Sequence, residues 1–288
     1  MKNNILRNLL FILPLMLPVA VFWLFPFICS IYISFTDWDY ISPAYHYVGF
    51  ENYTAMIEDS EFINALKNTL FFALGTVLPT TLLGLLLALL LQKKFAGGQF
   101  YRAVIFSPWI TPTVAVSIVW AWVFQSKNGL ANSLLMAIGV EPVAWLEQGN
   151  SAMFVVIVVT VWQSVGWTML FYISALGKIP ESLYEASMID GCSKMTRLLR
   201  ITLPLVSPTT FFLLIINMIN SLAAFDQFQI LTQGGPSGKT RTLFYLYFQQ
   251  AFDRYDMGPA AATSLVIVVI TAILVSINIY MGKRWVYY

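Results

Sequence analysis

Long runs of apolar residues, separated by short polar stretches, dominate the pattern along this chain of 288 residues. Six uncharged runs are long enough to cross the hydrocarbon core of a bilayer, which is about 30 Å thick and takes roughly 20 helical residues. They cover residues 9–35, 69–91, 103–125, 151–177, 201–225 and 257–282. None alternates polar and apolar positions as the strands of a membrane barrel do. The pattern predicts an all-α integral membrane protein with six transmembrane helices, each satisfying its own backbone hydrogen bonds.

Composition agrees with this prediction. Hydrophobic residues make up 58% of the chain and charged residues 10%, whereas a soluble domain carries about 25% charge. The first run follows Lys2 and Arg7, as the core of a signal peptide would, but it is far longer than the roughly 7–15 apolar residues of such a core. We therefore expect a retained helix, kinked at one or more of Pro14, Pro18 and Pro26.

The distribution of Lys and Arg predicts the orientation, because cytoplasmic loops carry an excess of both. With the N-terminus inside, the inner segments hold Lys2, Arg7, Lys93, Lys94, Arg102, Lys178, Lys194, Arg197, Arg200, Lys283 and Arg284. The outer segments then hold only Lys67, Lys127, Lys239, Arg241 and Arg254. Both termini, and the loop between the fourth and fifth runs, are expected in the cytoplasm.

That charged inner loop has the residues of two short helices. Pro180 suits the first turn of a helix, and Glu185 places negative charge near its positive end. Gly191 would break the helix in a tight or left-handed turn, and Ser193 can cap a second, basic helix. The small Ala186 would let the first helix lie in a groove on another protein. An interfacial helix on lipid headgroups is the alternative, and it accounts for the basic residues but not for the acidic ones.

The loop sequence EASMIDGCSKMTRLLRITLPL, residues 185–205, resembles the EAA loop of permease subunits of ATP-binding cassette (ABC) importers, the element that docks on a partner ATPase. Glu185, Ala186 and Gly191 match the glutamate, the first alanine and the spaced glycine of that pattern. Its trailing apolar-proline element is matched by Ile201, Leu203 and Pro204, while Ser187 and Cys192 depart from it with small residues. The resemblance implies that the coupling residues are Glu185, Ala186, Ser187, Asp190, Gly191 and Pro204.

Other segments are similar to carbohydrate permeases of the maltose-permease-like type I group. They are VGFENY at 48–53, FSPWITP at 106–112, and Phe225-Asp226 followed by LTQGGP at 231–236. The resemblance covers nearly the whole chain and implies a type I ABC importer permease fold in three parts. These are an N-terminal transmembrane helix and outer loop at 1–64, a permease core of five helices at 65–282 with its coupling loop at about 178–204, and a cytoplasmic tail at 283–288.

The function implied by the resemblance is that of a permease subunit, not an enzyme, which moves a sugar, oligosaccharide or glycosylated solute across the bacterial cytoplasmic (inner) membrane. The implied partners are a second, homologous permease in a heterodimer, an ABC ATPase dimer and an extracytoplasmic substrate-binding protein, with no nucleic acid. ATP and Mg would be bound by the partner ATPase, and no cofactor by this chain. The stretch GGPSGKT at 234–240 is not a phosphate-binding loop, because Gln233 stands where that motif needs glycine.

Three other functions are alternatives to this one. A stand-alone ion-coupled secondary transporter would need internal repeats and ionisable groups at mid-membrane, and neither is clear in the sequence. An ABC importer for a non-sugar solute remains an alternative. An intramembrane enzyme would need a catalytic constellation, and His46 is the chain's one histidine.

Polar and aromatic residues near the middle of two spans form the predicted substrate path. They are Trp162, Gln163 and Trp167 in the fourth run, Asn217, Asn220 and Ser221 in the fifth, and Asp226 near the outer end of the fifth. Uncharged amides and hydroxyls beside tryptophans suit a sugar, whereas an anionic solute would need a basic residue. Two alternatives stay open: the amides and hydroxyls bond helices to one another, and Asp226 either contacts a solute or proton or lies at a solvated helix end.

Overall fold

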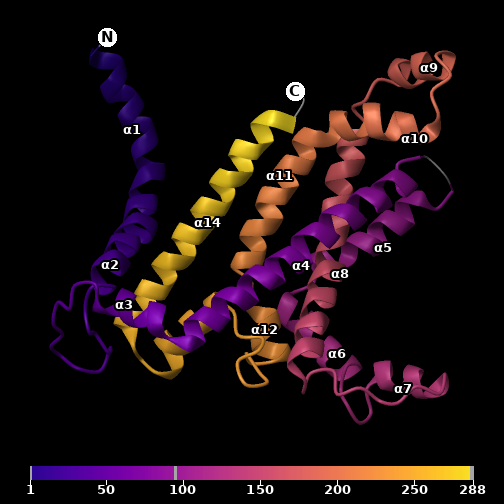
Figure 1. Ribbon diagram of the computed structural model, residues 1–288. Helices are drawn as coiled ribbons and strands as arrows, with labels where there is room; N and C mark the ends of the chain where they lie inside the picture. Colours follow the sequence, from indigo (N-terminus) through magenta and orange to yellow (C-terminus); the bar gives the residue numbers. More distant parts are fainter. Residues whose placement is uncertain (1, 94–95, 286–288) are drawn as a thin grey trace. The chain divides into compact units, whose positions relative to one another are not determined.

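The computed structural model describes residues 2–93 and 96–285, and within these ranges the chain is helical, with one isolated β-bridge between Thr36 and Tyr47 (Figure 1). The helices are α1 Lys2–Val19, α2 Phe25–Ile33, α3 Glu51–Glu58, α4 Ser60–Leu91, α5 Gly98–Ile110, α6 Thr113–Val123, α7 Leu130–Ala137, α8 Gly149–Leu176, α9 Glu181–Ile189, α10 Lys194–Arg197, α11 Leu203–Leu222, α12 Asp226–Leu231, α13 Leu243–Phe248 and α14 Met257–Trp285. Lys94 and residues 286–288 of the expected tail at 283–288 lie outside the described residues.

Five stretches of helix are long and apolar enough to cross a membrane, and a bent pair supplies a sixth span. The five are Phe11–Ile33, Ser60–Leu91, Gly149–Leu176, Lys194–Leu222 and Met257–Lys283. Each corresponds to one of the predicted runs, so the all-helical membrane fold is confirmed. The first span contains a π-helical turn, Ala20–Leu24, which falls between Pro18 and Pro26.

The prediction of a single helix over residues 103–125 for the third span was wrong. The span consists of α5 and α6, which meet at an angle of 99°. Between them Thr111 and Pro112 have extended backbone, with ψ angles of 134° and 130°. Pro112 has no N–H to donate, and its ring disfavours the helical conformation for the residue before it, which ends α5 at Ile110.

The chain forms two compact units, one comprising Leu246–Val269 and the residues up to Phe62, the other comprising the rest. In the first unit, the Asn52 side-chain amide donates to the carbonyl oxygens of Ser34 and Thr36, at 2.9 and 2.8 Å. These bonds hold α3 to the chain that leaves α2.

The first outer loop of this unit is ordered by its acidic residues. The backbone N–H of His46 donates to the Asp37 carboxylate at 2.6 Å, and this bond holds the pKa of Asp37 below its ordinary value. Asp39 accepts from the backbone N–H groups of Ile41 and Ser42. The loop therefore has a defined turn structure, although its side chains are largely exposed.

The second unit is organised around α8, which packs against α5, α11 and α12 (Figure 1). Fully buried valines of α8, such as Val155 and Val159, share a core with Phe72 of α4 and Phe228 of α12. The rings of Phe72 and Phe228 meet edge to face, with their centroids 4.8 Å apart. Nearer the other end of α8, Tyr172 and Met169 pack with residues of α4 and α11 in a second core.

A glycine sets the spacing between α5 and α8. A Cβ atom added to Gly166 would lie 2.1 Å from the carbonyl oxygen of Ile105, so the backbone of α5 lies directly against this position. Small residues permit such close approaches between membrane helices, where van der Waals packing drives association.

The Gly166→Ala variant should therefore unfold at a lower temperature, because its methyl group must displace backbone rather than a flexible side chain. The expected cost is about 1–3 kcal/mol, the usual range for overpacking. Thermal unfolding of the detergent-purified protein would measure it. The matched control is Gly177→Ala, directly after the last residue of the same helix, whose added Cβ would have its nearest neighbour at 3.4 Å. Equal stability of the two variants would contradict this account of the contact.

Candidate substrate path and coupling loop

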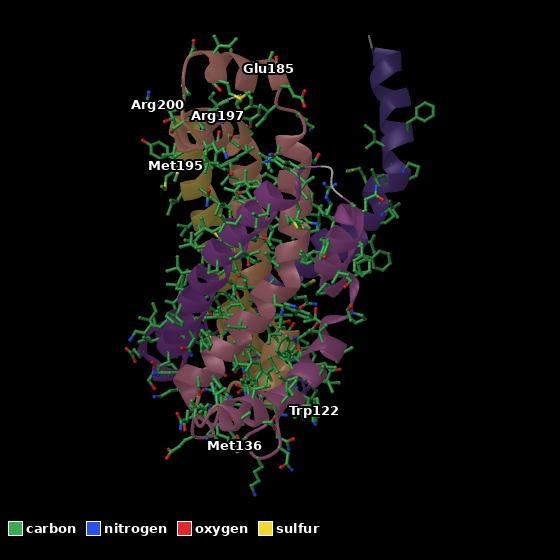
Figure 2. The ribbon with its side chains drawn as sticks, turned by 90° about the vertical axis from the view of Figure 1, so that its right-hand side faces the viewer. Trp122, Met136, Glu185, Met195, Arg197 and Arg200 are labelled. Atoms are coloured by element: carbon green, nitrogen blue, oxygen red, sulfur yellow. The ribbon has the colours of Figure 1, made fainter. Side chains whose placement is uncertain are left out.

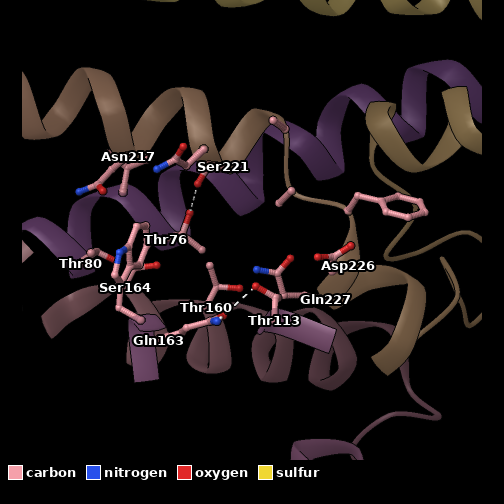
Figure 3. Close-up of a pocket in the computed structure, with 16 residues that line it drawn as sticks. Thr76, Thr80, Thr113, Thr160, Gln163, Ser164, Asn217, Ser221, Asp226 and Gln227 are labelled. Carbon is pink, nitrogen blue, oxygen red and sulfur yellow. Dashed lines mark hydrogen bonds between the residues drawn. The ribbon is translucent and has the colours of Figure 1, made fainter. Parts of the chain in front are cut away.

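A pocket of about 430 Å³ lies within the second unit (Figure 3). Helices α4, α5, α6, α8, α11 and α12 all contribute to its wall. Its polar and aromatic lining residues are Thr76, Thr80, Trp109, Thr113, Thr160, Gln163, Ser164, Asn217, Asn220, Ser221, Phe225, Asp226 and Gln227. The lining consists mainly of hydroxyls and amides, with Asp226 as its one charged member among the residues described.

Gln163 supplies hydrogen-bond donors to residues at the break between α5 and α6. Its buried side-chain amide donates to the carbonyl oxygen of Thr111 at 3.3 Å and to the hydroxyl of Thr113 at 3.2 Å. A backbone carbonyl outside a helix is costly in the membrane unless the protein supplies a donor. Gln163 therefore has a structural task in addition to its place in the pocket wall.

Asn217 and Ser221 also link helices. The Ser221 hydroxyl bonds to that of Thr76 on α4 (Figure 3). The Asn217 amide donates to the Thr168 hydroxyl on α8 at 3.5 Å. Both side chains are buried. These contacts fit the helix-linking alternative for the two residues, while leaving both in the wall of the pocket.

Asn220 differs from these neighbours. It lines the pocket, it is exposed, and its amide has no hydrogen-bond partner among the described residues. Asp226 is likewise exposed and lies in the first turn of α12, where a negative charge is favourable. Of the predicted path residues, these two have the side chains most available to a solute.

The two predicted tryptophans do not line the pocket. Trp162 meets Trp120 of α6 edge to face at 5.3 Å, and Trp167 stacks on Trp109 of α5 at the same distance. Trp109 is the tryptophan that reaches the pocket. The sequence analysis missed Trp109, which stands between the two prolines of the FSPWITP segment. It also missed the threonines and glutamine at Thr76, Thr80, Thr113, Thr160 and Gln227.

The inner loop has the two predicted helices. α9 starts directly after Pro180, Gly191 has a left-handed φ of +73°, and the Ser193 hydroxyl accepts from the backbone N–H of Thr196 at 3.2 Å. Ser187, which replaces the usual second alanine of the pattern, is buried, and its hydroxyl donates to the carbonyl oxygen of Tyr184 at 2.7 Å. A small side chain is needed there because this face of α9 lies against the rest of the loop.

Most of the surface of α9 is uncovered, including its apolar side chains. Leu183, Met188 and Ile189 are exposed, Ile189 at 87%, and Glu185 and Ala186 are exposed beside them. Figure 2 shows Glu185, Arg197 and Arg200 at one end of this unit and Trp122 and Met136 at the other.

The loop is also tied to the fifth span. The Tyr184 hydroxyl bonds to that of Thr202 at 3.0 Å, and Pro204 lies in the first turn of α11. Asp190 follows the last residue of α9. A displacement of α9 would therefore reach α11 through a direct contact.

Comparison with known proteins decides the family. Residues 80–287 match the family described as "binding-protein-dependent transport system inner membrane component". The chain belongs to this family. It is a multi-pass permease subunit of the cytoplasmic membrane rather than an enzyme, and ATP hydrolysis in such systems is carried out by a separate subunit.

Relatives of the permease match it along nearly its whole length. The trehalose/maltose transport system permease protein MalF of Thermococcus litoralis is 34% identical, covering 98% of each chain. The sn-glycerol-3-phosphate transport system permease protein UgpA of Agrobacterium fabrum is 32% identical, covering 99% of this chain and 97% of the other. The diacetylchitobiose uptake system permease protein NgcF of Streptomyces coelicolor is 32% identical over 92% of this chain and 80% of its own.

A solved structure has the same fold. A bacterial alginate ABC transporter in complex with an alginate pentasaccharide-bound periplasmic protein contains a chain that superposes with a TM-score of 0.86, covering 99% of this permease and 97% of that chain at 23% identity. Among the described residues of the permease, no group of three or more His, Cys, Asp or Glu side chains could hold a metal ion.

Different outcomes are expected for neighbouring residues of the pocket. Asn220→Ala should weaken uptake with little change in melting temperature, because its amide holds no other part of the protein. Ser221→Ala should lower the melting temperature slightly instead, since it removes the cross-helix bond to the Thr76 hydroxyl, which keeps its bond to the Phe72 carbonyl oxygen; a cross-helix bond of this kind contributes about 0.6 kcal/mol. Uptake and thermal unfolding measured on both variants test this, and wild-type uptake by Asn220→Ala would remove it from the path.

Proposed function

We propose that this permease moves a carbohydrate into a bacterial cell as part of a binding-protein-dependent ABC importer. The observation that supports a carbohydrate is the lining of the pocket. Hydroxyls and amides with one tryptophan offer hydrogen bonds to sugar hydroxyls and a flat face for a sugar ring. The names of the similar MalF and NgcF proteins point to the same class of solute.

The similarity to UgpA proteins suggests an alternative solute, one that carries a phosphate group. A phosphate would favour Arg or Lys, which bind it through charge-assisted hydrogen bonds. The described pocket wall has neither residue and carries the Asp226 carboxylate instead, which would repel an anion. The pocket therefore favours a neutral solute.

The complete importer would contain a second, homologous permease as a heterodimer partner, an ABC ATPase dimer that binds ATP and Mg, and an extracytoplasmic binding protein. α9 would lie in a groove of the ATPase, a helix-in-groove contact to which the exposed Leu183, Met188 and Ile189 contribute apolar side chains. Closure of the ATPases on ATP would move α9, and the contact of Tyr184 with Thr202 would pass the movement to α11.

The orientation follows the charge bias, with both termini in the cytoplasm. The permease core would extend from about residue 65 to 282, preceded by the first helix and its outer loop at 1–64 and followed by a cytoplasmic tail. This places α9 and α10 on the cytoplasmic side and the pocket's Asp226 towards the outer side.

Uptake by the reconstituted importer tests the solute class. Proteoliposomes with the two permeases, the ATPase and the binding protein should accumulate at least one of radiolabelled maltose, trehalose and diacetylchitobiose on addition of ATP, and not sn-glycerol-3-phosphate. Accumulation of the phosphate ester alone would overturn the carbohydrate assignment. Uptake without the ATPase would support a stand-alone transporter.

Docking through α9 is tested by one polar substitution. Ile189→Asp should lower the amount of ATPase recovered with the purified permeases, because a carboxylate would have to enter an apolar groove. Ile138→Asp, at an isoleucine after α7 that is 74% exposed, is the matched control and should leave recovery unchanged.

The orientation of the permease in the membrane, on which docking depends, is tested by a separate experiment. In a background lacking Cys29 and Cys192, Lys194→Cys should resist a membrane-impermeant thiol reagent in intact cells, while Glu58→Cys should react. Labelling of position 194 from outside, or full ATPase recovery with Ile189→Asp, would contradict the proposal.

A further inference from the structure

We infer that four aromatic side chains, Trp109, Trp167, Phe171 and Phe212, form a ladder along which the carbohydrate leaves the pocket toward the cytoplasmic end of the permease. This inference rests on the proposed function. It adds a second binding region, made of ring faces and two free hydroxyls, below the polar pocket.

The rings form a continuous series. Trp109 lines the pocket and stacks on Trp167 at 5.3 Å with an interplanar angle of 26°. Trp167 contacts Phe171 at 4.5 Å, and Phe171 stacks on Phe212 of α11 at 5.5 Å. Because Trp167 and Phe171 lie four residues apart on α8, the series advances one helical turn toward Leu176, where the coupling loop follows.

The ladder ends at a second cavity. Phe171 lines this cavity of about 440 Å³ together with Ser174, Lys178, Leu205 and Thr209 among others. The hydroxyls of Ser174 and Thr209 have no hydrogen-bond partner among the described residues, whereas Thr160 and Thr210 on the same two helices donate to carbonyls of their own turns. The two hydroxyls can form hydrogen bonds with the hydroxyls of a sugar, and the aromatic ring beside them can pack against the apolar face of the sugar ring.

The exposure of the rings fits a path better than a lipid contact. Phe171 and Phe212 are 37% and 42% exposed. Where α4 exposes a long face, it carries the regular leucine series Leu74, Leu78, Leu82 and Leu86, which suits lipid tails. The ladder instead connects the polar-lined pocket to a largely apolar cavity with three polar lining residues, Ser174, Lys178 and Thr209. Its exposed aromatic faces would bind a sugar ring weakly enough to release it.

The test replaces the rings by leucine and measures import in proteoliposomes of the complete importer, with maltose, trehalose and diacetylchitobiose run in parallel. For a sugar that the wild type imports, the Phe171→Leu/Phe212→Leu variant should import about tenfold less per ATP hydrolysed, since each ring contact contributes a modest factor. Phe171→Tyr/Phe212→Tyr should restore import, because it keeps both ring faces. Phe154→Leu, at an exposed phenylalanine of α8 outside both cavities, is the matched control and should import normally.

The outcomes separate this inference from the proposed function. Normal import by the double leucine variant would overturn the ladder while leaving carbohydrate import in place. A lower melting temperature or loss of the second permease from the leucine variant would show that the rings are a subunit or packing contact, which also overturns it. Failure of the wild type to import any of the three sugars would remove the proposed function and the inference together.

Discussion

The membrane imposes one constraint on which the rest of this structure depends: each backbone polar group within the bilayer needs a partner in the protein. The break at Thr111 and Pro112 would violate it, and the amide of Gln163 supplies the missing donor. That bond requires α5 to lie close to α8, which Gly166 permits by lacking a side chain. The bend, the close contact and the Gln163 amide therefore depend on one another. Residues on both sides of the bend, Trp109 and Thr113, line the pocket together with Gln163.

The polar residues of the pocket hold the helices together and also face its interior. The pairs Ser221–Thr76 and Asn217–Thr168 join α11 to α4 and α8. Each such bond contributes modestly in a membrane, because the separated helices also find partners. A permease must change the relative positions of its helices during transport, so several weak links serve it better than one strong one.

Much of this architecture follows from the sequence. Run length predicted the spans, and Pro180, Gly191 and Ser193 predicted the two helices of the inner loop, because these residues act through local backbone geometry. The bend at Pro112 was missed because hydropathy alone does not register a change of helix direction. Trp162 does not line the pocket although its neighbour Gln163 does, since adjacent residues on a helix point about 100° apart. The threonines were missed because in apolar runs they commonly bond their own helix, as Thr160 does.

The same limits explain why the sequence alone could not join the pocket to the inner loop. Asn220 and Phe171 lie on different helices, and no spacing rule relates them; only the packing of α8 against α11 brings their surroundings together. Once they are together, the arrangement has a physical logic. A solute must bind each region strongly enough to enter and weakly enough to leave. In the proposed path, exchangeable hydrogen bonds at Asn220 followed by ring contacts at Phe171 would give a series of weak sites. The Tyr184–Thr202 bond would link a movement of α9 to the start of α11, the helix that carries Asn220.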